Sequence, residues 1–337
     1  MKIAVIGGAG YIGSHVSREL LDFGHEVFVY DNLSSGLRQN LFEEADFTLG
    51  DILDVKALDN FFEKAKPEGI VHLAALKAAG ESMLLPEKYS VNNITGSINI
   101  LNAAAKHGVK YIVFSSSAAV YGNPKYLPMD EKHPTEPENY YGYTKLAIEQ
   151  YLEWYRKLRG INYAVLRYFN AAGYDIKGRI NGLEQNPANL LPIVMEAAIG
   201  KRAFVEVFGN DYETPDGTGI RDYIHVSDLA KAHRMAFDKL QKNSGSFTVN
   251  LGGNSGNSVL DVIKAAERIS GRKIEYKIAA RRAGDAAIVL ANPAYAKEFL
   301  NWQAEYSDLN TLIETTWTIY KQTLDMSAKY YYLCGET

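Results

Sequence analysis

The chain has 337 residues, of which 47% are hydrophobic and 23% are charged, and its formal net charge is −4. A chain of this length suits one large α/β unit or two domains that share an interface. The slightly negative charge argues against a general nucleic-acid binder, which needs a basic surface. Because Cys334 is the only cysteine, no disulfide can form within the chain and no cysteine metal site is possible.

Targeting and metal-binding segments are not expected. Glycines at 7, 8, 10 and 13 interrupt the apolar start too early for a cleavable signal peptide. No run approaches the ~18 apolar residues of a membrane span. The seven histidines show no metal-ligand spacing, so we expect no metal. A soluble cytoplasmic protein without a nucleic-acid or membrane partner is therefore expected.

Short β-rich runs alternate with helical patterns through the first half of the chain. Strands are predicted over residues 2–7, 26–31, 46–50, 70–74, 111–115 and 163–169, and helices over 12–23, 55–66, 91–107 and 141–158. Several strands are apolar nearly throughout, which is typical of parallel strands covered on both faces. The alternation predicts the α/β class, with a doubly wound parallel Rossmann sheet and right-handed crossovers.

The second half is broken into shorter pieces by prolines and glycines, which predicts a smaller, mixed α/β domain. We place the boundary at residue 170, so that the first domain covers 1–170 and the second covers 171–337. Segments near 223–251 are expected to return to the first domain, with a helix over 227–239 and a strand over 247–251. Residues after about 325 show no clear period and are expected to form a tail.

A glycine-rich turn follows the first strand. Gly7, Gly10 and Gly13 have the spacing G-x-x-G-x-x-G and open the first predicted helix. Because they lack side chains, the backbone can approach a pyrophosphate at the helix N-terminus, where N–H groups and the helix dipole favour anions. Taken alone, such a run is weak evidence, because a plain tight turn can have the same glycines.

Acidic residues at the ends of the next two strands favour the first interpretation. Asp31 ends the second strand, where its carboxylate can accept hydrogen bonds from an adenine ribose and repel a 2′-phosphate. It could instead cap the following turn with Asn32. Asp51 closes the third strand and could reach the adenine. Together these residues predict a dinucleotide site that prefers NAD to NADP.

Tyr141 and Lys145 are four residues apart on a predicted helix and therefore share one face. A lysine ammonium and a nicotinamide cation both favour the phenolate, which would lower the pKa of Tyr141 and make it a general base. Such pairs also arise by accident in a chain with 23 tyrosines. Ser117, at the end of the fifth strand, favours a catalytic set, because ligands bind at the carboxyl ends of strands in open α/β sheets.

These motifs resemble a known family. The glycine turn, SSSAAVYG (115–122) and YGYTK (141–145) resemble the extended short-chain dehydrogenase/reductases. LRYFNAAG (166–173), FGNDYETPDGTGIRDYIHVSDLA (208–230), NLGGNSGNSVLDVI (250–263) and RRAGD (281–285) resemble the UDP-glucose 4-epimerases, also called UDP-galactose 4-epimerases, of that class. The likeness covers residues 1–303. It implies a first domain that binds NAD and a second domain that binds a nucleotide sugar.

The resemblance also implies roles for individual residues. The catalytic positions are those of Ser117, Tyr141 and Lys145. Positions that contact NAD are occupied by Gly7, Gly10, Tyr11, Ile12, Gly13, Asp31, Asn32, Asp51, Ile52, Lys77, Asn92 and Phe169. Positions of the nucleotide-sugar site are occupied by Asn170, Asn189, Leu190, Phe208, Arg221, Arg282, Asp285 and Val289. Arginine suits a diphosphate because its planar fork can hold two oxygens.

The implied reaction inverts carbon 4 of a UDP-hexose through a transient 4-keto sugar with bound NAD. In the pattern of the related dehydratases, an acid–base pair directly follows the serine or threonine equivalent to Ser117. Ala118 and Ala119 occupy these positions here and cannot move a proton, so the resemblance favours simple epimerisation. Val289 is aligned with a family position that borders the substituent on carbon 2 of the hexose. The family pattern has a tyrosine there in enzymes confined to UDP-glucose and UDP-galactose, so the smaller valine implies that UDP-N-acetylhexosamines also fit. A 4-epimerase of UDP-uronates or UDP-pentoses and a redox-silent NAD sensor remain the alternatives. A homodimer is the family expectation.

Overall fold

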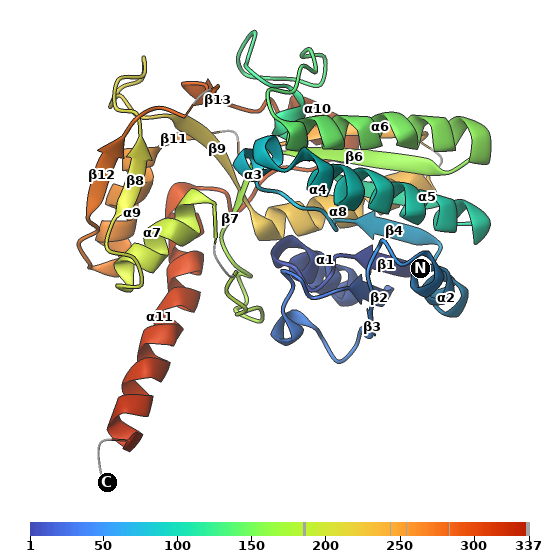
Figure 1. Cartoon of the computed structure of the whole chain (residues 1–337), viewed down its shortest axis with the longest axis horizontal. Helices are drawn as coiled ribbons and strands as arrows, with labels where there is room; N and C mark the ends of the chain where they lie inside the picture. The colour runs from blue at the N-terminus through green and yellow to red at the C-terminus, as the bar shows by residue number, and fades with distance from the viewer. Residues whose placement is uncertain (185–186, 243, 254, 283, 335–337) are drawn as a thin grey trace.

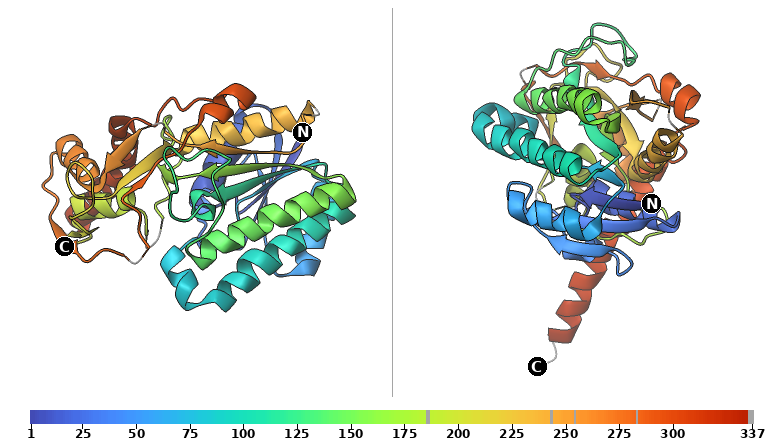
Figure 2. Two further views of the ribbon diagram at one scale, coloured as in Figure 1. Left: turned by 90° about the horizontal axis from the view of Figure 1, so that it is seen from above. Right: turned by 90° about the vertical axis from the view of Figure 1, so that its right-hand side faces the viewer.

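The computed structural model describes residues 1–184, 187–242, 244–253, 255–282 and 284–334, the last ten of these by their backbone only. Two lobes lie side by side, the larger one around a central sheet and the smaller one around short strands (Figures 1 and 2). Among the described helices, none is both long and apolar enough to cross a membrane.

The larger lobe is built on seven parallel strands in the order β10-β6-β5-β4-β1-β2-β3. The strands are β1 Lys2–Ile6, β2 Glu26–Asp31, β3 Asp46–Leu49, β4 Gly69–His72, β5 Tyr111–Ser117, β6 Asn162–Tyr168 and β10 Phe247–Leu251. This confirms the prediction of a doubly wound parallel α/β sheet. The chain moves from β1 out to β3 and then returns to β4 on the other side of β1. The point where the order reverses, at the carboxyl ends of β1 and β4, is where such sheets bind ligands.

Helices cover both faces of this sheet. One face carries α1 Tyr11–Asp22, α8 Val226–Gln241 and α10 Ala294–Leu300, and the other carries α2 Val55–Ala65, α5 Gly96–Lys106 and α6 Tyr140–Arg159. Strand side chains alternate between the faces, so that Ile3 and Val5 join one buried cluster and Ala4 and Ile6 the other. Both clusters are apolar, as a sheet covered on both sides requires.

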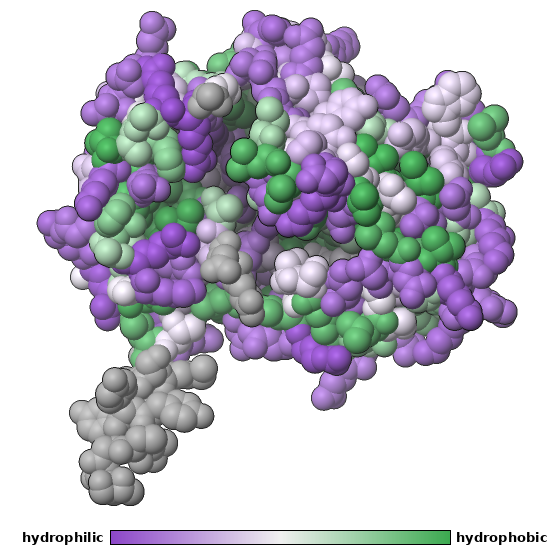
Figure 3. All heavy atoms as spheres, viewed as in Figure 1, coloured by the Kyte–Doolittle hydropathy of each residue, from purple (hydrophilic) through white to green (hydrophobic). Residues whose placement is uncertain are grey.

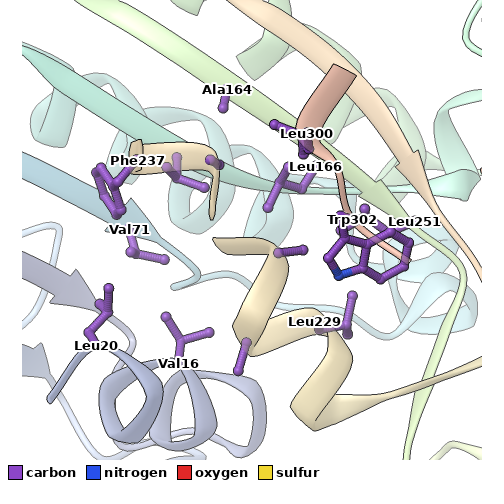
Figure 4. Close-up of a cluster of buried hydrophobic side chains, with 14 of the residues drawn as sticks. Val16, Leu20, Val71, Ala164, Leu166, Leu229, Phe237, Leu251, Leu300 and Trp302 are labelled. Carbon is purple, nitrogen blue, oxygen red and sulfur yellow. The ribbon is translucent and has the colours of Figure 1, made fainter. Parts of the chain in front are cut away.

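Late segments of the chain complete the first of these clusters. Figure 4 shows Val16 of α1, Phe237 of α8 and Trp302 packed over the strands. The predicted returning helix and strand are α8 and β10. The segment with α10 and Trp302 also returns to this face, which the sequence did not predict. Trp302 is 1% exposed and donates from its indole N–H to the carbonyl of Asp228 at 3.0 Å.

Short helical turns connect the strands at the ligand-binding edge. They are η1 Arg38–Asn40, α3 Ala79–Leu84, α4 Pro86–Tyr89, the π-helix η2 Ser90–Thr95 and η3 Ala118–Val120. The helix predicted over 91–107 is therefore two pieces, η2 and α5. A π-helical turn widens the backbone spiral and often marks a functional site.

The smaller lobe has a core of its own. Its elements are β7 Asn170–Ala172, α7 Leu190–Ala198, β8 Val205–Phe208, β9 Ile220–His225, β11 Gly256–Ser258, α9 Val259–Ser270, β12 Tyr276–Ala279, β13 Ile288–Val289 and α11 Leu309–Cys334. β9 pairs with β7, β11 and β13, and β8 pairs with β12. Apolar side chains of α7, α9 and α11 pack together beside these strands. α11 runs on to Cys334, where we expected a tail, and the side chains from residue 325 onward lie outside the description.

Candidate active site

The glycine turn leaves no room for side chains. A Cβ at Gly13 would lie 2.1 Å from the carbonyl oxygen of Gly7, and a Cβ at Gly7 would lie 2.7 Å from the backbone nitrogen of Ala74. Gly7 also has φ +90°, which favours glycine. Gly10 is the N-cap of α1, and among the described residues no side chain caps that end. The N–H groups of Gly7, Ala9 and Gly10 are bonded within the chain. The turn is therefore a close backbone cradle at the uncapped start of α1, which fits the pyrophosphate of a dinucleotide.

The acidic residues meet beside this cradle. Asp31 is 8% exposed, and its carboxylate accepts from the backbone N–H of Ala9 at 3.0 Å and of Leu33 at 2.8 Å. Burial raises its pKa, while both hydrogen bonds lower it. Asp31 thus supports the glycine turn and also caps the turn that follows. Asn32 donates to the carboxylate of Asp51 at 2.8 Å, which joins the ends of β2 and β3.

The remaining cofactor candidates border the same edge. Lys77 forms an ion pair with Glu184 of the smaller lobe. Asn92 lies in η2 and donates to the amide oxygen of Asn93 at 2.9 Å. Asn93, which the sequence did not single out, is fully buried and bonds both the N–H and the carbonyl of Leu76. It thereby holds the segment that carries Lys77.

Ser117, Tyr141 and Lys145 come together from two elements. Ser117 is the last residue of β5, and the other two lie one turn apart near the start of α6. Asn139 caps α6 by accepting from the N–H of Gly142 at 2.9 Å. A Cβ at Gly142 would lie 2.4 Å from the carbonyl oxygen of Ala119, so glycine lets α6 approach the segment after Ser117.

The members of this group lie close to one another. The Ser117 hydroxyl lies close enough to the Tyr141 phenol to lower its pKa by hydrogen bonding. Lys145 Nζ lies 5.8 Å from the centroid of the Tyr141 ring and donates to the carbonyl of Ser115 at 2.7 Å. Both Tyr141 and Lys145 are positioned by α6, which packs against β5 through buried apolar side chains.

The pKa values differ from the simple expectation. Burial raises the pKa of Tyr141 to about 12, although the hydrogen bond with Ser117 lowers it. Burial also lowers the pKa of Lys145 to about 7, and the charge of Glu149 opposes this. These side chains alone therefore do not produce the lowered tyrosine pKa that we expected from Lys145. A positive charge placed beside the phenol would favour its ionised form.

The nucleotide-sugar candidates line the facing side of the smaller lobe. Arg221 of β9 forms an ion pair with Asp285. The guanidinium of Arg282 lies 3.9 Å from the centroid of the Phe208 ring, stacked as a cation–π pair. In the pairing of β13 with β9, Val289 lies opposite Arg221. The backbone N–H of Asp285 donates to the carbonyl of Arg282 at 3.2 Å, so the ion pair and the stacked pair are adjacent.

Four further candidates lie between the lobes. Asn170 begins β7 and donates to the carbonyl of Asp222 at 2.8 Å. Asn189 precedes α7 and lines a small cavity with Tyr11 and Glu184, while Leu190 packs on the core of the smaller lobe. Phe169 and Val289 are partly buried against the small cluster of Val120, Tyr121 and Met129, as is Ala118. Val289 therefore lies near the residue that follows Ser117.

Sequence analysis missed a buried polar group behind the catalytic set. Glu149, Arg167 and Tyr121 are hydrogen-bonded to one another and are at most 9% exposed. The available signal was the position of Glu149, four residues after Lys145 on the same helix. A buried carboxylate and guanidinium need a partner, and here each is the partner of the other.

Comparison with known proteins agrees with this geometry. Residues 3–252 match the NAD dependent epimerase/dehydratase family, and the chain belongs to that family. It is 44% identical over 322 residues to a UDP-glucose 4-epimerase of Halalkalibacterium halodurans, which covers 96% of each chain. The UDP-glucose 4-epimerase from Brucella ovis in complex with NAD has a similar structure, with a TM-score of 0.92, 43% identity and coverage of 94% of this chain and 98% of that one. The corresponding enzyme from Bifidobacterium longum in complex with NAD+ and UDP has a TM-score of 0.89 and 38% identity, covering 96% and 98%.

Proposed function

We propose that the chain interconverts UDP-glucose and UDP-galactose by inverting carbon 4 of the sugar. The observation that carries the proposal is the meeting of Ser117, Tyr141 and Lys145 at the carboxyl end of β5, next to the glycine cradle. The glycine cradle and Asp31 would hold NAD, which when bound would supply the acceptor and donor of the hydride for a transient 4-keto sugar and would be restored in every turnover.

Proton transfer and substrate binding are assigned to different side chains of the site. Tyr141 removes the proton of the 4-hydroxyl and later returns it, and Ser117 holds the sugar oxygen and the phenol together. Lys145 supplies the cation beside the phenolate. Arg221 and Arg282 hold the diphosphate, so the intermediate stays bound by its nucleotide while the hexose turns.

The neighbouring residues favour epimerisation over other reactions of the family. Ala118 and Ala119 follow Ser117 directly, and neither side chain can move a proton. Elimination of water from the 4-keto sugar needs an acid–base pair at this place. A redox-silent NAD sensor would have no need for a hydroxyl, a phenol and an ammonium in contact.

A single assay tests the proposal. Purified protein should release NAD on denaturation and should interconvert UDP-glucose and UDP-galactose without added cofactor. A protein that holds NAD but leaves both sugars unchanged would favour the sensor. Conversion of UDP-uronates or UDP-pentoses alone would favour a sibling epimerase.

A second proposal concerns the N-acetylated sugars. Val289 packs against the same small cluster as Ala118, the residue that follows Ser117. A valine leaves the volume of an aromatic ring open there, and an acetamido group can fill it. UDP-N-acetylglucosamine and UDP-N-acetylgalactosamine should therefore also be interconverted. Val289→Tyr should abolish this activity and spare the plain hexoses, and equal rates on both sugar pairs in that variant would refute the idea.

We also propose a cytoplasmic homodimer. The single cysteine suits a reducing compartment. Figure 3 shows apolar surface over α3, where Met83 is 59% and Leu84 80% exposed. On α6, which packs against α3, Trp154 is 58% and Leu158 65% exposed. Such side chains suit a contact between copies. Light scattering should give the mass of two chains, and a monomer at micromolar concentration would contradict the proposal.

A further inference from the structure

A buried carboxylate lies directly behind the catalytic set. Glu149 is one helical turn after Lys145 on α6, and it is 9% exposed. Its Oε1 accepts from the hydroxyl of Ser116 at 2.5 Å and from Nε of Arg167 at 3.0 Å, and its Oε2 accepts from Nη2 of Arg167 at 2.5 Å. The carboxylate is therefore fixed by three charge-assisted or hydroxyl hydrogen bonds, which is an unusually complete set.

These bonds fasten the end of β5 to α6 at consecutive residues. The carbonyl of Ser115 accepts from Lys145 Nζ at 2.7 Å, and the hydroxyl of Ser116 donates to Glu149. Ser117 follows and carries the hydroxyl that contacts Tyr141. One turn of α6, from Lys145 to Glu149, thus sets the position of the strand end from which Ser117 projects.

The network continues away from the site. Nη1 of Arg167 donates to the phenol of Tyr121 at 3.0 Å, and Tyr121 donates to the amide oxygen of Asn250 at 2.7 Å. Asn250 donates in turn to the carbonyl of Met129 at 3.0 Å. Arg167, Tyr121 and Asn250 come from β6, the segment after β5 and β10. Glu149 is therefore held by a rigid frame and has little freedom to turn away from Lys145.

We propose that Glu149 is a positioning residue of the reaction: through Ser116 it fixes the β5 end that carries Ser117, and it lies one helical turn from Lys145 on α6. This inference rests on the proposed roles of Ser117, Tyr141 and Lys145. Glu149 does not touch the site itself. It acts through Lys145 and Ser116.

The charges around Lys145 support this role. Burial lowers the pKa of Lys145 to about 7, and the nearby Glu149 carboxylate is the charge that raises it. Tyr141 on α6, the Phe114 ring of β5 at 4.9 Å and His72 of β4 also face Lys145. His72 stays neutral, because burial and the charge of Lys145 lower its pKa to about 3.

Charged and titratable groups also surround Glu149. Arg167 of β6 is its direct partner, with Ser116 on β5, and the phenol of Tyr163 on β6 feels its negative charge. Arg167 offsets part of the carboxylate's field. Lys145 is affected by Glu149 nonetheless, because it shares a helix face one turn away.

These positions determine in which direction the loss of the Glu149 charge changes the ionisation of Lys145 and Tyr141. Without the Glu149 charge, burial should lower the pKa of Lys145 below about 7, so that it is mostly neutral at neutral pH. In the holoenzyme, where the nicotinamide cation would also favour the phenolate and bring its ionisation towards neutral pH, Tyr141 then loses one of two cations, and its ionisation moves to higher pH. We expect Glu149→Gln to shift the ionisation of Tyr141 upward by about 1 pH unit and to lower kcat at pH 7 about tenfold, with KM for the UDP-sugar unchanged.

The experiment measures the phenolate absorbance of the holoenzyme as a function of pH and subtracts the absorbance of the Tyr141→Phe protein. It also measures the pH profile of kcat. The matched control is Glu153→Gln, which neutralises a more exposed carboxylate one turn further along α6. The control should keep the parent's profile. A structural role alone would lower activity by the same factor at every pH, and that result in Glu149→Gln would overturn the inference.

A double-mutant cycle separates this inference from the proposed function. In a Lys145→Met background, Glu149→Gln should add no further shift, because the charge that it supports is gone. If Lys145→Met moves the ionisation of Tyr141 and Glu149→Gln does not, the inference fails while the proposed function stands. If Tyr141→Phe turns over normally, the proposed function fails.

A second variant covers loss of folding, since Glu149→Gln leaves the Arg167 charge buried without its partner. Glu149→Gln combined with Arg167→Gln removes both charges and leaves amides that can bond each other. The ionisation of Tyr141 should still move upward in this protein, by less than in the single variant. An unchanged ionisation in the double variant would also overturn the inference.

Discussion

Some side chains at the catalytic edge of the sheet have two roles, and the residue type alone does not reveal both of them. Asp31 was open to two interpretations, a ribose acceptor or a turn cap. In the structure its two oxygens accept from Ala9 and Leu33, so it caps the turn and still lies beside the glycine cradle. Tyr141 likewise combines a partly buried ring with a phenol close to Ser117. Sequence spacing predicts that such residues meet, but not what their environment does to their pKa.

Replacing Tyr141 by phenylalanine tests the proposed base at this scale. The ring and its packing are retained, and only the group that moves the proton is lost. We expect kcat to fall by about 10² to 10⁴, the usual contribution of a general acid–base group. Affinity for the UDP-sugar should change little, because Arg221 and Arg282 lie on the other lobe. Steady-state kinetics and UDP titration measure both quantities.

Tyr143→Phe is the control for this change. Tyr143 lies on the same helix, is 51% exposed and stacks on Tyr140 with ring centroids 5.5 Å apart. Its removal should leave turnover near the parent's value. Normal turnover in Tyr141→Phe, or an equal loss in both variants, would assign the base to another group.

At the scale of elements, Asp222 joins three segments of the smaller lobe. It lies in β9, is fully buried, and accepts from the N–H of Gly253 at 2.6 Å and of Ala291 at 3.2 Å. These bonds connect β9 with the segments after β10 and β13. Burial raises the pKa of Asp222 to about 7, although both hydrogen bonds lower it. The position of β9, which carries Arg221, therefore depends on a carboxyl with a pKa of about 7.

The raised pKa predicts how stability changes with pH. The folded protein binds the Asp222 proton up to about pH 7, whereas the unfolded chain releases it near its ordinary value of 3.8. Stability from this group is therefore largest in acid and is lost as pH rises from about 4 to about 7. Between pH 5 and 8 the loss is at most roughly 3 kcal/mol. Asp222→Asn should flatten this slope in urea unfolding.

The comparison variant is Asp238→Asn, which changes a carboxyl with 43% of its side chain exposed. It should retain the slope of the parent protein. A parent and an Asp222→Asn protein with the same dependence on pH would show that Asp222 ionises at its ordinary value in the folded chain.

Elements with a strong period were predictable, and elements that depend on distant contacts were not. The strands β1 to β6 and the helices α1, α2 and α6 follow directly from alternating apolar runs and helical patterns. α10 and Trp302 gave no comparable signal, because their place is fixed by contact with α8 and β10, far away in the sequence. The ion pair of Lys77 with Glu184 joins residues 107 positions apart, which no spacing rule covers.

For the whole molecule, the site lies where two separately packed lobes meet. The larger lobe has two apolar clusters around its sheet, and the smaller lobe has one of its own. Tyr11 donates to the carbonyl of Gly173, at 2.5 Å, and Arg179 pairs with Asp22, at 2.6 Å, across the junction. The cofactor candidates belong mainly to the larger lobe and the diphosphate candidates to the smaller one. Each ligand should therefore stabilise the lobe that it binds and, through the junction, the whole chain.

Ligand removal and addition test this arrangement. A ligand that binds only the folded protein stabilises it by RT ln(1 + [L]/Kd), which is about 2.7 kcal/mol at one hundred times Kd. Stripping NAD should lower the unfolding temperature, and NAD or UDP added at that excess should raise it. Arg221→Ala should lose the increase caused by UDP and keep the increase caused by NAD, because Arg221 lies on β9 of the smaller lobe. Scanning calorimetry at several ligand concentrations measures each increase. If Arg221→Ala abolished the response to NAD as well, or left the response to UDP intact, the division of the two ligands between the lobes would be wrong.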